Sequence, residues 1–144
     1  MVDPLMSANF RRSEFECSCC SEAIIQPDLP VALQELRDLL GSPIVITSGY
    51  RCKTHNEAIG GAKFSAHLGG FAADCTFPGK SLLDAYLNVV RCLPWANSGG
   101  IGLYPDRNFI HLDVRKKRKR WGQIDGKQVS FDRALLELGG SENA

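Results

Sequence analysis

The hydrophobic positions of this chain repeat with a helical period in some segments and alternate as in a β-strand in others. Apolar residues at helical spacing predict amphipathic helices over residues 30–40 and 81–93, and Gly41 is a natural stop for the first of them. A shorter helix is expected over 52–59, and one or two helical turns over 131–138. The chain therefore carries helices at intervals along most of its length.

Between these helices the pattern is that of strands. Residues 43–47 are a short β-branched run, and we expect them to form a central strand. A second apolar run begins at Asp74, and residues 99–104 and 109–114 predict a hairpin across the turn 105–108. Strands separated by helices, with one clear hairpin, predict an α+β fold in which helices flank a mainly antiparallel central sheet.

Length and composition are those of one globular domain. The 144 residues suit a single domain, 1–144, with a core over about 10–138 and flexible ends. A hydrophobic content of 44% and a charged content of 23% are typical of such proteins. No apolar run approaches the roughly 20 residues that span a bilayer, and residues 1–6 lack the basic and apolar regions of a signal peptide. We therefore expect a monomer that is cytoplasmic as synthesised and has no membrane partner.

Two of the three histidines lie near carboxylates in a pattern that suits a metal site. Asp74 follows His67 by seven residues, and the alternation over 109–114 places His111 and Asp113 on one face of a strand. Neutral imidazole and carboxylate are good zinc ligands, and a catalytic zinc usually takes three protein ligands and a water molecule. Spacing alone leaves an ordinary surface or core role open for each histidine.

A longer motif surrounds the first pair. Ser65-x-His67-x-x-Gly70-x-Ala72-x-Asp74 resembles the zinc motif of the D-Ala-D-Ala carboxypeptidase and murein endopeptidase family, which shares its fold with the hedgehog signalling domain. Other segments resemble the same family in the same order: the cysteine-rich start 15–20, found in one branch of the family, then 48–51, 99–105 and 109–113. The resemblance covers roughly residues 10–121, nearly the whole chain.

The resemblance implies a function and a set of site residues. It implies one catalytic Zn²⁺ held by His67, Asp74 and His111, with a zinc-activated water as the nucleophile. It also implies that Arg51 is a catalytic arginine that pairs with the oxyanion or with a carboxylate of the substrate. The implied activity is hydrolysis of peptide bonds in bacterial peptidoglycan, in stem peptides or cross-links, and the choice between D,D-carboxypeptidase and murein endopeptidase stays open.

One position departs from the family pattern. Many relatives carry an acidic residue three positions before the last histidine ligand, where this chain has Asn108, which cannot accept and return a proton. We expect Asp113 to act as the catalytic base, and the alternative is that it orients His111. Ser65 and Tyr104 are expected to contribute to substrate binding, Ser65 as a hydrogen-bonding residue and not as a nucleophile.

Six cysteines in a chain without an export signal favour reduced thiols or a metal site over a disulfide framework. Four of them are Cys17, Cys19, Cys20 and Cys52. These could hold a second, structural zinc, or pair as a disulfide in an oxidising compartment. Their spacing is not that of the common Cys-x-x-Cys knuckle, so it favours a third alternative, small buried thiols that pack the N-terminal segment.

The strongest charge run is 115–120, which holds six of the 17 basic residues. The other 11 face 16 acidic residues, so the rest of the chain is acidic on balance and the net charge is only +1. Such a run is usually a solvated loop, and it could bind a polyanion such as a wall polymer. Because no nucleic-acid fold signature accompanies it, we do not expect nucleic acid to be a partner.

Three functions are therefore carried forward. The first is the zinc peptidase of peptidoglycan, and its small size without an export signal suggests a phage- or prophage-encoded product that is released to the cell wall. The second, kept open by Asn108, is a non-catalytic zinc-binding module of the same fold that binds cell wall or a protein partner. The third is a basic nucleic-acid-binding protein that uses residues 115–120.

Overall fold

A six-stranded sheet organises the chain. The computed structural model describes residues 2–142, and within them the sheet has the strand order β3-β4-β6-β5-β7-β8. In that order the strands are β3 (Val45–Ser48), β4 (Ala72–Thr76), β6 (Phe109–Asp113), β5 (Gly100–Tyr104), β7 (Lys119–Ile124) and β8 (Lys127–Val129). Neighbours are antiparallel except β5 and β7, which run parallel. The predicted α+β fold with a mainly antiparallel sheet is confirmed.

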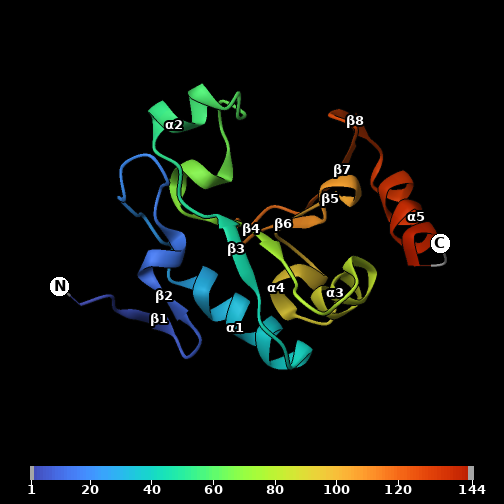
Figure 1. Cartoon of the computed structure of the whole chain (residues 1–144), viewed down its shortest axis with the longest axis horizontal. Coiled ribbons are helices and arrows are strands. Elements are labelled where there is room, and N and C mark those ends of the chain that lie inside the picture. The colour runs from blue at the N-terminus through green and yellow to red at the C-terminus, as the bar shows by residue number, and fades with distance from the viewer. Residues whose placement is uncertain (1, 143–144) are drawn as a thin grey trace.

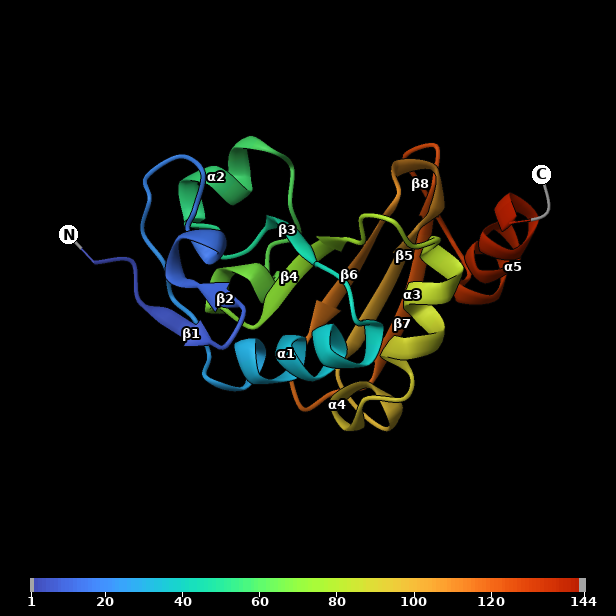
Figure 2. The same cartoon turned by 60° about the horizontal axis from the view of Figure 1, so that its bottom comes forward.

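Helices cover one face of this sheet (Figures 1 and 2). They are α1 (Asp28–Leu40), α3 (Leu82–Val89) and α5 (Phe131–Glu142). The connections contain α2 (Lys53–Ala58), α4 (Leu93–Ala96), η1 (Arg12–Phe15), η2 (Ala66–Gly69) and η3 (Pro105–Arg107). A separate hairpin of β1 (Leu5–Ser7) and β2 (Phe10–Arg11) lies at the opposite end of the molecule from α5 (Figure 1). Over the described residues, we find no helix with the length and apolar character of a membrane span.

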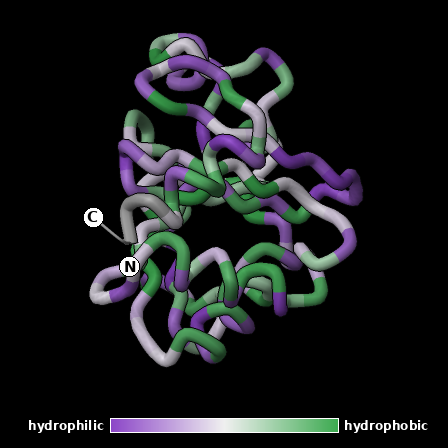
Figure 3. Tube along the Cα trace, turned by 90° about the vertical axis from the view of Figure 1, so that its right-hand side faces the viewer, coloured by the Kyte–Doolittle hydropathy of each residue, from purple (hydrophilic) through white to green (hydrophobic). Residues whose placement is uncertain are grey.

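The core lies between the helices and the sheet. Because strand residues alternate between faces, Ile101 and Leu103 of β5 and Ile110 and Leu112 of β6 all point toward the helices and are fully buried. Burying a side chain of this size contributes roughly 1.5–3 kcal/mol of transfer free energy. Figure 3 shows the same separation along the trace, with the most hydrophilic stretches at the periphery.

The opposite face of the sheet carries polar residues in one row. Asp74 of β4 lies opposite His111 of β6 in the strand register. His111 in turn lies opposite Gly102 of β5, and Gly102 lies opposite Trp121 of β7. Cross-strand neighbours share a face of a sheet. The fold therefore brings Asp74 and His111 together although they are 37 residues apart in the sequence.

Each predicted helix and the predicted hairpin have a counterpart, although the helix expected over 81–93 ends at Val89. The prediction of a central strand over 43–47 is wrong. Among the strands of residues 2–142, β3 lies at the edge of the sheet and pairs only with β4. Val45 is 45% exposed, as expected for an edge strand. A β-branched run indicates a strand but does not say how many neighbours that strand has. The segment ends before the loop of Arg51, so β3 still delivers that residue to the site.

The basic run 115–120 is only partly the solvated loop that its composition predicts. Its last two residues, Lys119 and Arg120, begin β7. The guanidinium of Arg120 donates hydrogen bonds to the carbonyl oxygens of Gly99 at 2.9 Å and Trp95 at 2.6 Å. Arg120 therefore fastens β7 to α4 and to the turn before β5, and this end of the run has a structural role.

Candidate metal centre

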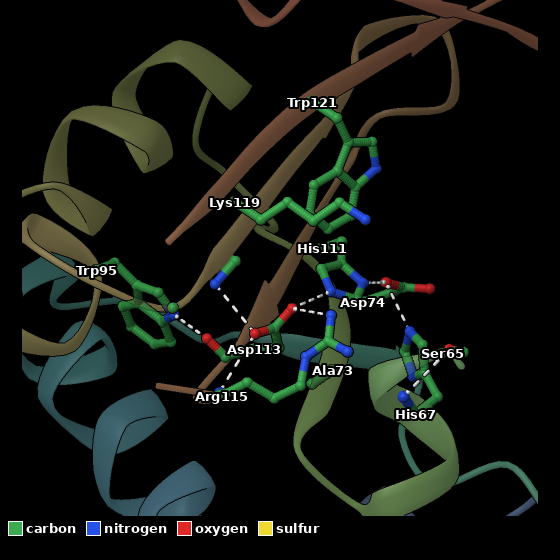
Figure 4. A network of polar contacts seen from close by, with 12 residues as sticks. Ser65, His67, Ala73, Asp74, Trp95, His111, Asp113, Arg115, Lys119 and Trp121 are labelled. Atoms are coloured by element: carbon green, nitrogen blue, oxygen red, sulfur yellow. Dashed lines mark hydrogen bonds and ion pairs between the residues drawn. The ribbon is translucent and has the colours of Figure 1, made fainter. Parts of the chain in front are cut away.

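Two histidines and one aspartate converge on the polar face of the sheet (Figure 4). Asp74 lies in the middle of β4 and His111 in the middle of β6, and His67 reaches them from η2. Asp74 Oδ1 lies 3.1 Å from His111 Nδ1 and 3.3 Å from His67 Nε2. The three candidate ligand atoms lie within 4.8 Å of one another, and all three residues are buried. One cation could contact all three atoms at once.

The hydrogen bonds of His67 leave its Nε2 atom available to a metal. Nδ1 lies 2.7 Å from the carbonyl oxygen of Gly49, and because a carbonyl only accepts, Nδ1 carries the proton. Nε2 therefore has a lone pair directed at Asp74 Oδ1, another acceptor. Within the described chain this buried nitrogen has no hydrogen-bond partner. Two acceptors that face each other are unfavourable, and a cation bound to both would remove the conflict, so these residues fit a metal ion.

His111 is oriented by a second carboxylate. Its Nε2 donates to Asp113 Oδ2 at 2.9 Å, which turns Nδ1 toward Asp74. Histidines that bind metals commonly donate their other ring N–H to a carboxylate or a carbonyl. Both arrangements occur here, the carbonyl on His67 and the carboxylate on His111. The two imidazoles are thus held in the tautomers that metal ligation requires.

Charge pairing keeps the carboxylates ionised. Burial raises the pKa of Asp74, but the adjacent imidazoles of His111 and His67 outweigh it and hold that pKa below the usual range of a carboxyl. Burial also raises the pKa of Asp113, and the contact with His111 produces a net decrease. Burial lowers the pKa of His111, while the neighbouring carboxylates of Asp113 and Asp74 give a net increase. Two negative charges beside the imidazoles favour a divalent cation.

Asp113 lies behind His111 and is surrounded by hydrogen-bond donors. Its side chain is fully buried, and Oδ1 accepts from the backbone N–H groups of Gly100 at 3.0 Å and Arg115 at 3.3 Å. Oδ2 accepts from His111 and lies 3.7 Å from Nη2 of Arg115. Its backbone carbonyl accepts from Trp95 Nε1 (Figure 4). These contacts favour the positioning alternative, and the role of Asp113 as a base stays a prediction.

Arg51 holds the other oxygen of Asp74. Its Nη2 lies 3.2 Å from Asp74 Oδ2, while Nε donates to Ser48 Oγ at 3.0 Å and Nη1 to Asn56 Oδ1 at 3.4 Å. The ion pair directs Asp74 Oδ1 at the two histidines. Because a guanidinium has more N–H groups than these contacts engage, Arg51 could still donate to a bound molecule.

An open cleft of about 1040 Å³ passes over the centre. Ser65, Tyr104 and Arg51, the residues expected to bind substrate, all line it. Ser65 Oγ also caps η2 by accepting from the His67 backbone N–H at 3.2 Å. Six cations line the cleft: Arg51, Lys63, Arg107, Arg115, Lys117 and Lys119. In the part of the chain that the structure describes, Asp74 is the one acidic residue in that lining, so the cleft favours an anionic ligand.

Two glycines that the sequence reasoning did not single out make room for the site. A Cβ at Gly100 would clash with the carboxylate of Asp113, and a Cβ at Gly102 would clash with the indole of Trp121. The absence of a side chain at Gly102 lets the Trp121 ring lie 4.7 Å from the ring of His111, centroid to centroid. In the sequence, Gly100 and Gly102 alternate with the apolar residues Ile101 and Leu103. This alternation could have indicated a strand whose polar face lacks side chains.

The departure at Asn108 has a backbone explanation. This residue follows η3 in the turn between β5 and β6, and its φ of 56° is in the left-handed region. Asparagine is among the few non-glycine residues that are enriched in that conformation. Asn108 is exposed and does not line the cleft.

The four cysteines Cys17, Cys19, Cys20 and Cys52 also come together, with their sulfurs within 4.8 Å of one another. All are free thiols. The prediction of small buried thiols is wrong for Cys19 and Cys20, which are exposed, because the loop that carries them lies on the surface.

Fold and site together define a class of protein: an α+β domain whose mainly antiparallel sheet carries a candidate His-Asp-His metal centre beneath an open cleft. Residues 8–113 match the Peptidase M15 family, and the chain belongs to that family. The matched range includes all three candidate ligands.

Curated relatives carry the same name in several bacteria. The chain is 37% identical over 101 residues to the peptidoglycan L,D-endopeptidase MepK of Escherichia coli (strain K12). The matched region covers 65% of this chain and 53% of the relative. The protein of that name from Shigella flexneri matches equally. The probable peptidoglycan L,D-endopeptidase MepK of Haemophilus influenzae is 33% identical over 81 residues, 53% of this chain and 41% of the relative. The chain thus spans about half the length of the curated relatives it matches.

Proposed function

We propose that this protein is a zinc-dependent peptidase that hydrolyses peptide bonds in bacterial peptidoglycan. The observation that carries the proposal is the buried Nε2 of His67, which has no hydrogen-bond partner in the described chain and is directed with Asp74 and His111 at one point beside an open cleft. Membership of the Peptidase M15 family and the similarity to enzymes named as peptidoglycan endopeptidases support it.

The residues of this chain would share the work as follows. His67, Asp74 and His111 would hold the zinc ion, which when bound supplies an acidified water and polarises the scissile carbonyl. Asp113 keeps the ring of His111 in place. Arg51, already fixed on Asp74, would donate an N–H to the carbonyl oxygen as negative charge develops on it.

The cleft supports a peptidoglycan substrate and an internal cut. Stem peptides carry free carboxylates, and the cleft presents six cations. Its lining runs from the 59–65 loop, next to α2, to β7 and β8, which lie at the sheet edge opposite β3 (Figure 1). A cleft that continues past the metal ligands in both directions suits a peptide that extends on both sides of the bond. We therefore favour endopeptidase over carboxypeptidase activity.

Digestion of purified peptidoglycan tests the function directly. Mass spectrometry of the soluble products should show new stem-peptide fragments with wild-type protein, and these should disappear with a chelator or in His67→Ala. Loss of a single terminal residue would identify a carboxypeptidase instead. A protein that binds about one zinc at the His-Asp-His centre but releases no product would identify the non-catalytic module, and absence of zinc there would exclude both.

The non-catalytic module remains the second candidate because of one observation. Where many relatives carry an acid, this chain has an exposed asparagine in a turn, and in the described residues no carboxylate other than that of Asp74 lines the cleft. Nucleic-acid binding is less well supported, since Arg120 of the basic run is engaged with backbone carbonyls.

A further inference from the structure

Two segments of the chain meet at a group of four sulfurs outside the proposed active site. Cys17, Cys19 and Cys20 lie in the loop that follows η1, and Cys52 is the N-cap residue of α2. Cys19 Sγ lies 3.6 Å from Cys17 Sγ and 3.3 Å from Cys52 Sγ. All four sulfurs are within 4.8 Å of one another. Cys19 and Cys52 are 33 residues apart in the sequence, so tertiary structure produces the cluster.

These distances fit one tetrahedral metal better than they fit disulfides. A sulfur–sulfur bond is about 2.05 Å long, and one bond would use only two of the four thiols. Around a zinc ion with Zn–S bonds of about 2.3 Å, the sulfurs of a tetrahedron lie about 3.8 Å apart. The shortest separations here, 3.3 and 3.6 Å, are close to that value. Without a cation, four sulfurs at these distances have little to hold them together.

The backbone around the sulfurs is already arranged as it is around bound thiolates. The N–H of Cys52 points at Cys17 Sγ at 3.5 Å, and the N–H of His55 points at Cys52 Sγ at 3.4 Å. The loop is closed on itself by a hydrogen bond from the N–H of Cys17 to the carbonyl of Glu22 at 2.7 Å. Donors directed at the sulfurs would stabilise negative charge on them.

We propose that Cys17, Cys19, Cys20 and Cys52 bind a second zinc ion, as four thiolates, in a structural site. Four protein ligands close the tetrahedron and leave no position for water, so this ion takes no part in hydrolysis. Thiolate ligands favour zinc over magnesium or calcium, which prefer oxygen. The near-surface position of Cys19 and Cys20 gives the ion a path into the site.

The position of the site explains what the ion would do. Cys52 directly follows Arg51, and the N–H of Tyr50 donates to the carbonyl of Phe15 at 2.8 Å. Gly49, whose carbonyl fixes the tautomer of His67, packs so closely on the backbone of Phe15 that a Cβ there would clash. The second ion would therefore hold the N-terminal segment against the loop that positions both Arg51 and His67.

Metal analysis separates this site from the first. After purification under reducing conditions and removal of loosely bound metal, we expect about two zinc ions per chain in the wild type and about one in His67→Ala. Cys20→Ser, at an exposed position, should also retain about one. A His67→Ala protein without zinc would overturn the proposal. Because this reading does not depend on hydrolysis, it stands or falls independently of the proposed function.

Cobalt gives the matching spectroscopic test. His67→Ala loaded with Co²⁺ should show intense sulfur-to-cobalt charge-transfer absorption and the visible bands of a tetrahedral site. Cys92→Ala, which removes a buried thiol outside the cluster, is the control and should leave both features unchanged when made in the same background. Cys52→Ala should abolish them. A Cys19–Cys52 disulfide found by mass spectrometry in protein purified without oxygen would also overturn the proposal.

Discussion

The two candidate metal sites are built in opposite ways. The His-Asp-His centre takes two of its three ligands from the middles of paired strands, lies buried under a cleft, and has three protein ligands. The cysteine cluster takes all four ligands from loops and a helix N-cap, and two of them are exposed. Three ligands leave a coordination position for water, whereas four do not. The same ion would thus serve chemistry in one place and structure in the other.

The difference also concerns what holds each site when no ion is bound. Strand register and the bonds from Gly49 and Asp113 fix the histidines, so the first centre is preformed. The cysteine loop has few backbone bonds to the rest of the chain, so its geometry should depend on the ion itself. Removing each ion should therefore have different consequences.

The largest expected effect is on activity, from His67→Ala. The variant loses a ligand of the preformed centre, so peptidoglycan hydrolysis should fall to background while the unfolding midpoint changes by only a few degrees. His55→Ala is the control, since this third histidine contacts Ser18 and lies outside the centre. If His67→Ala cleaved at a rate near that of the wild type, the centre could not be catalytic.

Cys52→Ser should have the reverse profile, a loss of stability larger than its loss of activity. The binding free energy of a structural ion is part of the folding free energy. A loss of about 2 kcal/mol would lower the unfolding midpoint by roughly 6 °C in a domain of this size, measured by circular dichroism. A chelator should lower the midpoint of the wild type by a similar amount and that of Cys52→Ser much less. Equal sensitivity of both proteins would contradict a cysteine-bound ion.

Asp113→Asn should lower the zinc affinity of the His-Asp-His centre and leave that of the cysteine cluster unchanged. As a positioning residue, Asp113 acts through His111, so zinc affinity at that centre, measured by competition with a chelator, should fall about 10–100-fold. Saturating zinc should then restore most of the activity. If zinc affinity stays at the wild-type level while kcat falls strongly, Asp113 is the base. Gln123→Ala, at another cleft position, is the control.

The two candidate metal sites also differ in how far the sequence could predict them. The resemblance to the family implied that His67, Asp74 and His111 would converge, and the alternation of the strand around His111, which assigns that residue to one face, agreed with it. The meeting of Cys52 with Cys17, Cys19 and Cys20 was only one open alternative, since no periodicity relates positions on separate loops. Their spacing argued against a metal, and only the fold brings the fourth sulfur to the others.

Strand pairing in the sheet shows the same limit of prediction from sequence. The β5–β6 hairpin is local and was predicted from its turn, but the parallel pairing of β5 with β7 is not local and was not. That pairing places Trp121 beside Gly102 and so completes the cleft wall. The composition of the basic run 115–120 predicted a solvated loop, so it did not indicate that β7 begins at Lys119.

The smallest expected effect tests that cleft wall. Trp121 Nε1 donates to Tyr104 Oη at 3.1 Å, which joins β7 to the end of β5 above the metal ligands. Tyr104→Phe removes only the hydroxyl, and a hydrogen bond of this kind contributes about 1 kcal/mol, so KM for peptidoglycan fragments should rise about 2–10-fold with zinc content unchanged. Trp121→Phe removes the donor and part of the ring. If the bond between them is what matters, the double variant should lose less than the product of the two single effects. Strictly multiplicative losses would mean that each ring contacts the substrate independently, and a loss of zinc in Tyr104→Phe would mean that the wall supports the centre as well as the substrate.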